Sequence, residues 1–319
     1  MLAGQTCEAR PGLQGPGVPE GSVAGWQPQA QWLREFLLQA RANGTMPDVL
    51  SWHDYQGDPR MIGSMQRELR DWMVEQGMEA AATVRMGYNE IVDSRHAQSA
   101  GYHIAVAAAL WRARVDHAAL GCWSQPGAAP AAISTCWDGS LDGSLDPLSN
   151  FSARPVWHAL RWLAQITAPS TPDVQSVALA ITESPAHAAR MRGSSSGYIG
   201  SVGATVDANK CGLDGVVSRS GAALTVLLGR WATPAVDPGS KSATLDLGVC
   251  ALPRCVRMQR LPACVGPLSA PCAALPAPII EQPVFLRANS TGAIHLNISE
   301  AEALRIDVSM NSTCVSGKT

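Results

Sequence analysis

The sequence predicts an α/β unit with a parallel sheet, followed by an antiparallel β-sandwich. Up to about residue 168, segments with helical spacing of apolar residues alternate with short apolar runs, and this order is typical of a parallel sheet. From Ala168-Pro169 onwards, Pro, Gly and Ser separate short β-rich runs that have no helical period. We therefore expect two domains, residues 1–168 and 169–319.

The first domain is expected to contain four helices and three strands. Its opening 28 residues are rich in Gly and Pro and are expected to form a loop. Apolar residues then recur at spacings of three and four, which predicts helices, and short buried runs between them predict strands. The expected helices cover about residues 32–40, 62–73, 95–115 and 156–166, and the expected strands 48–52, 80–86 and 118–123.

The second domain is expected to contain six strands. They are predicted at residues 174–181, 223–228, 243–249, 284–287, 293–298 and 304–308. The segment 253–278 is rich in Pro and Cys, and proline cannot donate a hydrogen bond to a β-ladder. We therefore expect a long surface loop there.

Charge and hydropathy exclude two classes of partner. The formal net charge is -2, and Lys and Arg form no cluster, so a nucleic acid is not expected as a partner. No run approaches the roughly 20 apolar residues that a membrane-spanning helix needs. We expect no membrane span.

Sequons and cysteines favour a secretory protein. Five Asn residues open N-x-Ser/Thr sequons, with chance in a Ser-rich chain as the alternative: Asn43, Asn150, Asn289, Asn297 and Asn311. Cysteine occurs nine times, and the residues are either disulfide-bonded or free buried thiols. The opening MLAGQTCEARPG lacks the apolar core of a signal peptide. We nevertheless expect a glycoprotein that is secreted or resides in the lumen of the secretory pathway.

Polar and aromatic residues end each of the three expected strands. These motifs are Trp52-His53-Asp54-Tyr55, Gly87-Tyr88-Asn89-Glu90 and Gly121-Cys122-Trp123. In a parallel α/β barrel, the carboxyl ends of the strands converge on the active site. By residue type alone, however, a Glu after a strand is more often a solvated loop residue, and the His, Tyr and Trp could equally cap a loop or fill a core.

Together these motifs resemble the retaining (β/α)8-barrel glycoside hydrolases, most closely family 39, which includes β-xylosidases and α-L-iduronidases. PDVLSWHDY is similar to the sixth strand of that family, VRMGYNE to the seventh and LGCW to the eighth. FSARPVWHALRWL resembles the helix that closes the barrel, and LQGPGVPEG with WLREFLLQA resembles the fifth strand loop and its helix. The resemblance implies a partial TIM barrel, about strands 5 to 8, followed by a β-sandwich.

The resemblance also implies roles for individual residues. Glu90 would be the catalytic nucleophile of a double displacement at O-glycosyl bonds. Tyr55 would donate a hydrogen bond that lowers the pKa of this carboxylate and orients it. His53 and Asn89 would contact sugar hydroxyls, and Trp123 would be a platform for a sugar ring. The expected partner is an oligo- or polysaccharide, and neither a metal nor an organic cofactor is expected.

The second carboxylate of a retaining glycosidase is missing from this pattern. Such enzymes use two carboxylates about 5 Å apart, and in this family the acid/base lies in an Asn-Glu pair after the fourth strand. The chain contains one Asn-Glu pair, Asn89-Glu90, which fits the seventh strand. We expect a fragment or a truncated gene model. The alternatives are a catalytically inactive relative that binds glycan or protein, and an α/β protein with an unrelated sandwich.

Overall fold

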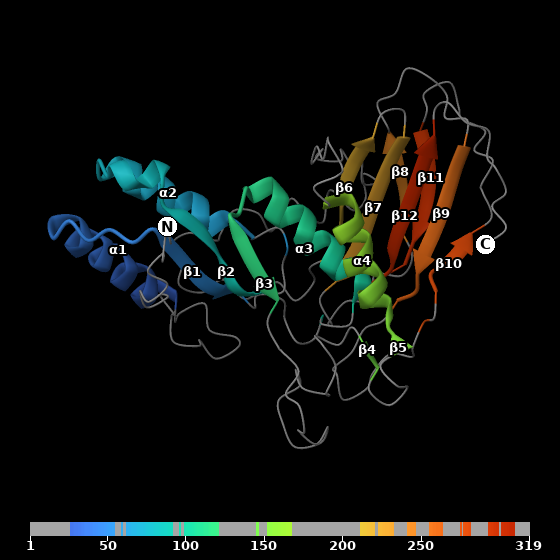
Figure 1. Cartoon of the computed structure of the whole chain (residues 1–319), viewed down its shortest axis with the longest axis horizontal. Coiled ribbons are helices and arrows are strands. Elements are labelled where there is room, and N and C mark those ends of the chain that lie inside the picture. The colour runs from blue at the N-terminus through green and yellow to red at the C-terminus, as the bar shows by residue number, and fades with distance from the viewer. Residues whose placement is uncertain are drawn as a thin grey trace, which may run out of the picture.

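A computed structural model places a parallel sheet and an antiparallel sandwich at opposite ends of the molecule, with helix α3 between them (Figure 1). It describes residues 26–54, 59, 62–91, 96, 99–120, 145–146, 152–167, 211–220, 223–232, 241–246, 255–263, 275, 277–281, 293–299 and 301–309. The structure therefore contains both an α/β part and an all-β part, as the sequence predicts.

The α/β part is built on a three-stranded parallel sheet. Strands β1 (Val49–Asp54), β2 (Arg85–Ile91) and β3 (His117–Leu120) lie in the order β1-β2-β3. Helix α1 (Trp26–Ala42) precedes β1, and helix α2 (Ser64–Glu75) connects β1 to β2 through the short 3-10 helix η3 (Glu79–Ala82). This alternation of helix and parallel strand follows the spacing of apolar residues along the chain.

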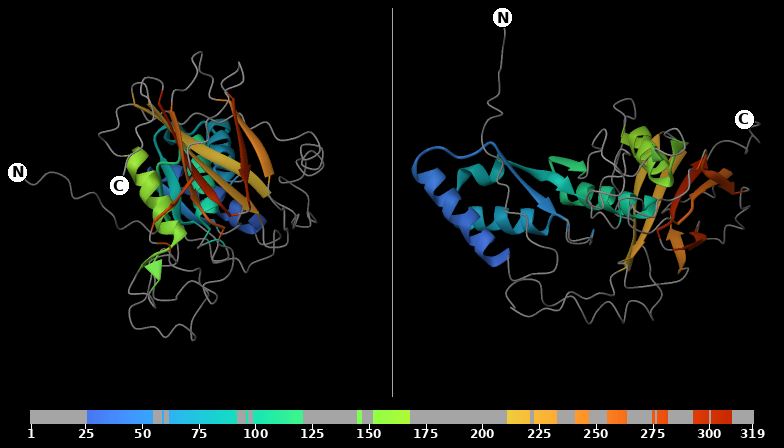
Figure 2. Two further views of the ribbon diagram at one scale, coloured as in Figure 1. Left: turned by 90° about the vertical axis from the view of Figure 1, so that its right-hand side faces the viewer. Right: turned by 90° about the horizontal axis from the view of Figure 1, so that it is seen from below.

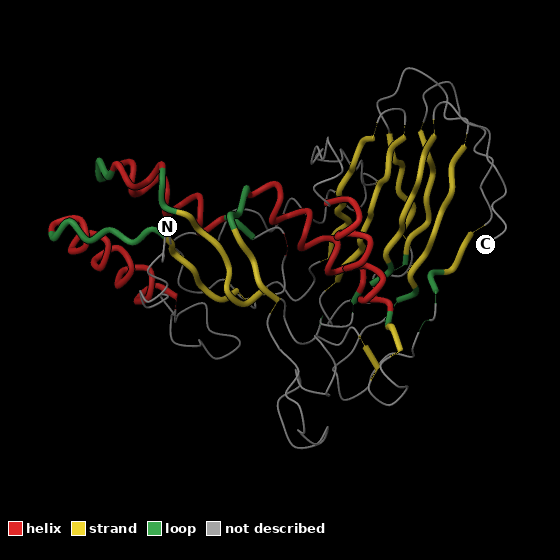
Figure 3. Tube along the Cα trace, in the orientation of Figure 1, coloured by secondary structure: helices red, strands yellow, loops and turns green. Residues whose placement is uncertain are grey.

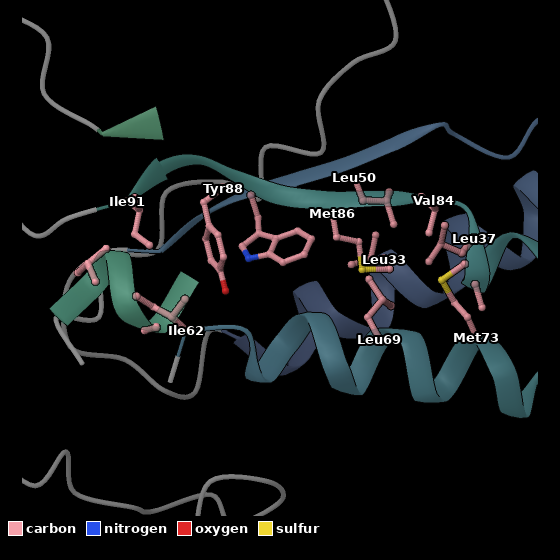
Figure 4. Packing of buried hydrophobic residues seen from close by; sticks show 14 of the residues in the cluster. Leu33, Leu37, Leu50, Ile62, Leu69, Met73, Val84, Met86, Tyr88 and Ile91 are labelled. Carbon is pink, nitrogen blue, oxygen red and sulfur yellow. The ribbon is translucent and has the colours of Figure 1, made fainter. Parts of the chain in front are cut away.

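Apolar side chains from the helices and one face of this sheet form the first core. Leu37, Met73 and Met86 have no exposed surface, and Leu50 is almost as deeply buried. Figure 4 shows these side chains filling the space between the sheet and helix α2. Burial of each such side chain stabilises the fold by about 1.5–3 kcal/mol. The core therefore fixes which face of the strands is turned towards the helices.

The all-β part is a two-layer antiparallel sandwich (Figure 2). One layer has five strands in the order β10-β9-β12-β7-β6, and the other pairs β11 with β8. Leu296 and Ile298 of β11 pack in the same apolar cluster as residues of the five-stranded sheet, which joins the two layers. The bounds are β6 Cys211–Ser220, β7 Ala223–Ala232, β8 Lys241–Asp246, β9 Cys255–Leu261, β10 Ile279–Glu281, β11 Ala293–Ile298 and β12 Ala303–Ser309.

Helix α3 (Ala100–Ala113) belongs to the cores of both parts. Nine of its 14 residues are buried, so it has no single apolar stripe. Tyr102, Ala105, Val106 and Ala109 pack in the α/β core, whereas Ala100, Ile104 and Ala108 pack against α4 (Pro155–Thr167) and the five-stranded sheet. Two short strands, β4 (Leu145–Asp146) and β5 (Ser152–Ala153), precede α4.

Two glycines let the backbone of α3 touch the sandwich. A Cβ atom on Gly101 would lie 2.2 Å from the carbonyl oxygen of Arg230, and a Cβ atom on Gly229 would lie 2.1 Å from the carbonyl oxygen of Gly101. The Gly101 amide also donates a hydrogen bond to the Ala301 carbonyl at 3.1 Å. The helix and the sheet therefore approach too closely for any side chain at these two positions.

Polar contacts continue this interface to the other end of α3. The guanidinium of Arg112 donates two hydrogen bonds to the carboxylate of Asp214 in β6. These hydrogen bonds, opposed by partial burial, raise the pKa of Arg112 above its usual value. Figure 3 shows α3 and α4 lying against the same side of the sandwich. The α/β part and the sandwich are thus joined along the length of a helix.

The structure confirms the four predicted helices and corrects two predictions about strands. Residues 80–86 were expected to form a strand, but Glu79–Ala82 is a 3-10 helix and the strand begins at Arg85. Ala81 is buried in the core from a turn of 3-10 helix, so this part of the chain does not need to be extended to bury an apolar side chain.

The predicted surface loop at 253–278 is wrong over its first half. Strand β9 lies between β10 and β12, inside the five-stranded sheet. Its residues from Cys255 to Leu261 contain no proline, and Val256, Met258 and Leu261 are buried while Arg257 is exposed. The prolines at 253 and 262 flank the strand, so the ladder keeps all its donors. Strands β6 and β10 were also not predicted.

Two other predicted features lie outside the described residues. They are the strands at 174–181 and 284–287 and the domain boundary at 168/169, which falls just beyond the end of α4 at Thr167. Both stay predictions.

Replacing Gly101 by Ala is expected to destabilise the protein. In an ordinary helix this change gains about 1 kcal/mol, but here the new methyl group would collide with two carbonyl oxygens. We expect a net loss of about 2 kcal/mol in the free energy of unfolding, measured by urea denaturation. Ala107→Gly on the same helix is the matched control for the intrinsic difference between Ala and Gly. A gain in stability for Gly101→Ala would contradict the close contact.

Candidate active site at the carboxyl ends of the parallel strands

The backbones of His53 and Glu90 are paired across neighbouring strands. His53 of β1 is the register partner of Glu90 of β2, and Asp54 is the partner of Ile91. Because the strands are parallel, both residues lie at the carboxyl edge of the sheet. The sequence motifs predict this juxtaposition, and it brings two of the five predicted site residues to one edge.

The sheet is irregular where these residues lie. The register shifts between Trp52 and His53 in the β1–β2 pairing, and again between Tyr88 and Ile91 in the β2–β3 pairing. Tyr88 and Ile91 nevertheless pack in the same core, although they are three residues apart. Bulges of this kind re-aim side chains and are frequent beside active sites. Asn89 and Glu90 occupy the irregular stretch.

Of the predicted site residues, three lie in described strands and two do not. His53, Asn89 and Glu90 are placed by their backbones in β1 and β2. Tyr55 and Trp123 lie outside the described residues. The predicted pocket shared by positions 55, 90 and 123 therefore stays a prediction.

Gly87, three residues before Glu90, is required by the packing of β2 against β3. Gly87 is paired with His117 of β3, and a Cβ atom at Gly87 would lie 2.3 Å from the His117 carbonyl oxygen and 2.5 Å from two atoms of its ring. The imidazole of His117 thus lies on the face of β2 opposite to the buried side chains of Met86 and Tyr88. Only glycine leaves room for that contact next to the candidate nucleophile.

Tyr88 occupies the opposite face and is 1% exposed. Its ring meets the Trp52 indole edge to face, with centroids 5.4 Å apart, and its hydroxyl accepts a hydrogen bond from the Gly63 amide at 2.7 Å. No role for Tyr88 was expected from the sequence. An isolated aromatic residue in a strand gives no local sign of a hydrogen bond to a residue 25 positions away.

Two other features are not connected with this edge. A shallow hollow of about 570 Å³, lined in part by Arg41, Met46 and Thr83, lies at the amino ends of β1 and β2. His96 and His103 are buried, and His96 stacks on Tyr102 with centroids 4.3 Å apart. Within the described part of the chain, no three His, Cys, Asp or Glu residues are grouped to hold a metal ion, and no helix is long and apolar enough to cross a membrane.

Gly87→Ala is expected to lower the free energy of unfolding by roughly 1–3 kcal/mol because the added methyl group overpacks the β2–β3 contact. Thermal and urea denaturation give this value directly. His117→Ala alone should cost little, since that side chain is exposed. The double variant should recover only part of the loss, because the His117 carbonyl oxygen stays in the way; full recovery would show that the ring is the sole obstacle.

Comparison with known proteins identifies a fold and not a family. No protein-family model matches the chain, and no curated protein sequence matches it. Solved structures do resemble it. A monomeric β-xylosidase from Caulobacter crescentus superposes with a TM-score of 0.51 at 15% identity, over 94% of this chain and 61% of that one.

Two further structures give similar values. A protein from Neocallimastix frontalis has a TM-score of 0.53 at 16% identity, over 88% of this chain and 58% of its own. A glucosidase from Croceicoccus marinus has a TM-score of 0.50 at 13% identity, over 88% and 57%. The chain spans less than two thirds of the length of each. It has a glycoside hydrolase-like fold.

Proposed function

We propose that the protein is a glycosidase of the family 39 type, which hydrolyses O-glycosyl bonds of an oligo- or polysaccharide with retention. In this proposal the parallel sheet is the second half of a (β/α)8 barrel, and the cleft lies at its carboxyl edge. The observation that carries the proposal is the parallel pairing of β1 and β2, with His53 opposite Glu90 at that edge.

The order of the motifs along the sheet supports this proposal. Strands β1, β2 and β3 are neighbours in sequence order, and each leads into one of the three motifs with polar or aromatic residues. The fold likeness to a β-xylosidase and a glucosidase extends over both the α/β part and the sandwich.

The proposed reaction is a double displacement. A carboxylate oxygen of Glu90 attacks the anomeric carbon, the bond to the leaving oxygen breaks, and a glycosyl-enzyme forms. Water then attacks the same carbon and releases Glu90. Tyr55 donates a hydrogen bond to the carboxylate, His53 and Asn89 bind sugar hydroxyls, and Trp123 stacks on a sugar ring. A second carboxylic acid, which the motifs of this chain do not supply, would protonate the leaving oxygen and then, as a carboxylate, take up the proton of the attacking water.

Trapping of the glycosyl-enzyme tests this role for Glu90. The probes are a β-configured deoxyfluoro-xyloside and the matching glucoside, each with a dinitrophenolate leaving group. Dinitrophenolate departs without protonation, so the probe needs only the nucleophile, and the fluorine slows hydrolysis of the adduct. We expect a mass increase of one fluorosugar, located at Glu90 by peptide mass spectrometry.

Two variants of this chain make the test specific. Glu90→Gln should abolish trapping, whereas Glu79→Gln, at the exposed start of η3, should leave the rate unchanged. Saturable binding of the sugars without an adduct would overturn catalysis in favour of the glycan-binding alternative. If the chain shows neither sugar binding nor labelling, both carbohydrate functions are contradicted.

We further propose that the protein is N-glycosylated in the secretory pathway. Asn43 and Asn297, the two sequon residues whose side chains the structure describes, are both exposed. When the chain is secreted from a eukaryotic host behind a foreign signal peptide, Asn43→Gln and Asn297→Gln should each remove one glycan from the intact mass. A secreted protein whose mass is unchanged by peptide N-glycosidase would contradict this.

A further inference from the structure

One buried hydroxyl connects strand β2 with the connection that follows β1. Tyr88 projects from β2 towards the start of α2, with its oxygen at the far end of the ring (Figure 4). That oxygen accepts the hydrogen bond from the Gly63 amide at 2.7 Å in a buried setting. A buried amide is costly to leave without an acceptor, so this contact restrains the backbone at residue 63.

Gly63 is held from a second side as well. It is the N-cap of α2 and has a φ of 80°, a left-handed conformation that favours glycine. A Cβ atom there would lie 2.2 Å from the Cβ atom of Ala113, the last residue of α3. The backbone at residue 63 therefore lies between the end of α3 and the hydroxyl of Tyr88 and contacts both.

Ile62, directly before Gly63, belongs to the same core. Pro59 is buried, and the Ile62 amide donates to its carbonyl oxygen at 3.2 Å. Ile62 is 5% exposed and packs in one cluster with Tyr88 and Ile91. The end of the β1–α2 connection is thus fixed to strand β2, and Tyr88 supplies the polar part of that attachment.

We infer that Tyr88 is a positioning residue, which sets the spacing between the N-terminal end of α2 and the segment of β2 that carries Glu90. The inference rests on the proposed function, in which Glu90 is the nucleophile. Tyr88 lies two residues before Glu90 in β2, and Tyr55 lies one residue after β1 ends at Asp54. One hydroxyl therefore couples the strand segment that bears the proposed nucleophile to the N-cap residue of α2.

Tyr88→Phe isolates the hydroxyl, because phenylalanine keeps the ring and its packing against Trp52. The first measurement is amide hydrogen exchange at Gly63 in the full chain. We expect faster exchange at Gly63 in the variant, with the amides of the sandwich strands unchanged. If the Gly63 amide exchanges at the same rate in Tyr88→Phe as in the unmodified chain, the hydroxyl does not restrain residue 63, and this result does not depend on any sugar chemistry.

The second measurement is the kinetics of trapping by the activated fluorosugar that labels the unmodified chain. We expect the saturating rate to fall roughly tenfold or more, since small misplacements of reacting groups cost rate steeply. The half-saturating probe concentration should change less than twofold. This split separates positioning from a general loss of structure, which would lower the fraction of protein labelled instead of its rate.

Thr225→Val is the matched control. It removes another partly buried hydroxyl, whose 2.8 Å hydrogen bond to Asp307 lies in the sandwich. This change should leave the trapping rate unchanged. If the unmodified chain is labelled and Tyr88→Phe is labelled equally fast, the inference is wrong and the proposed function stands. If the unmodified chain is not labelled at Glu90, the proposed function fails and the inference falls with it.

Discussion

The buried helix α3 is the constraint on which the arrangement of this molecule depends. Its two faces belong to different cores, and its first turn approaches the sandwich so closely that Gly101 and Gly229 leave no space for side chains. Close packing of this kind resists small displacements, because every atom that moves loses contacts or collides. The sandwich is therefore an extension of the α/β core, and its removal would expose one face of α3. The ion pair between Arg112 and Asp214 restrains the other end of the same helix.

The same helix also bears on the candidate active site. Its last residue, Ala113, leaves no room for a side chain at Gly63, and Gly63 in turn donates to Tyr88 in the strand that carries Glu90. Packing contacts thus run from the sandwich through α3 to the carboxyl edge of the parallel sheet. Sites held by rigid elements keep reacting groups within the small tolerances that catalysis needs. This continuity gives a physical reason for the sandwich to accompany the sheet in a glycosidase-like fold.

The residues at the sheet edge show how far local patterns lead. The motifs ending at Tyr55, Glu90 and Trp123 were found because polar residues interrupt apolar strands, and the backbone pairing of His53 with Glu90 agrees with their predicted order. Strand β9 was missed because the prolines around it dominated the composition of the segment, although its own residues alternate between buried and exposed. Strand β2 was placed too early because alanines are as compatible with a 3-10 turn as with an extended strand. In both cases a composition averaged over many residues concealed the behaviour of a few.

The sequence by itself determined the four helices and the parallel order of the first strands, because helical spacing and the alternation of helices with short apolar runs are local properties of the chain. The role of Glu90 as nucleophile follows from the resemblance to family 39 and stays a prediction. Only the tertiary structure decided that α3 is buried on two sides, that Gly101 meets Gly229, and that the hydroxyl of Tyr88 binds the amide of Gly63. These contacts join residues far apart in the chain, and their energies depend on distances of a few ångströms that no local pattern encodes. Glycine and tyrosine can have many structural roles, and the residues that lie next to them in the folded protein decide which role each one has.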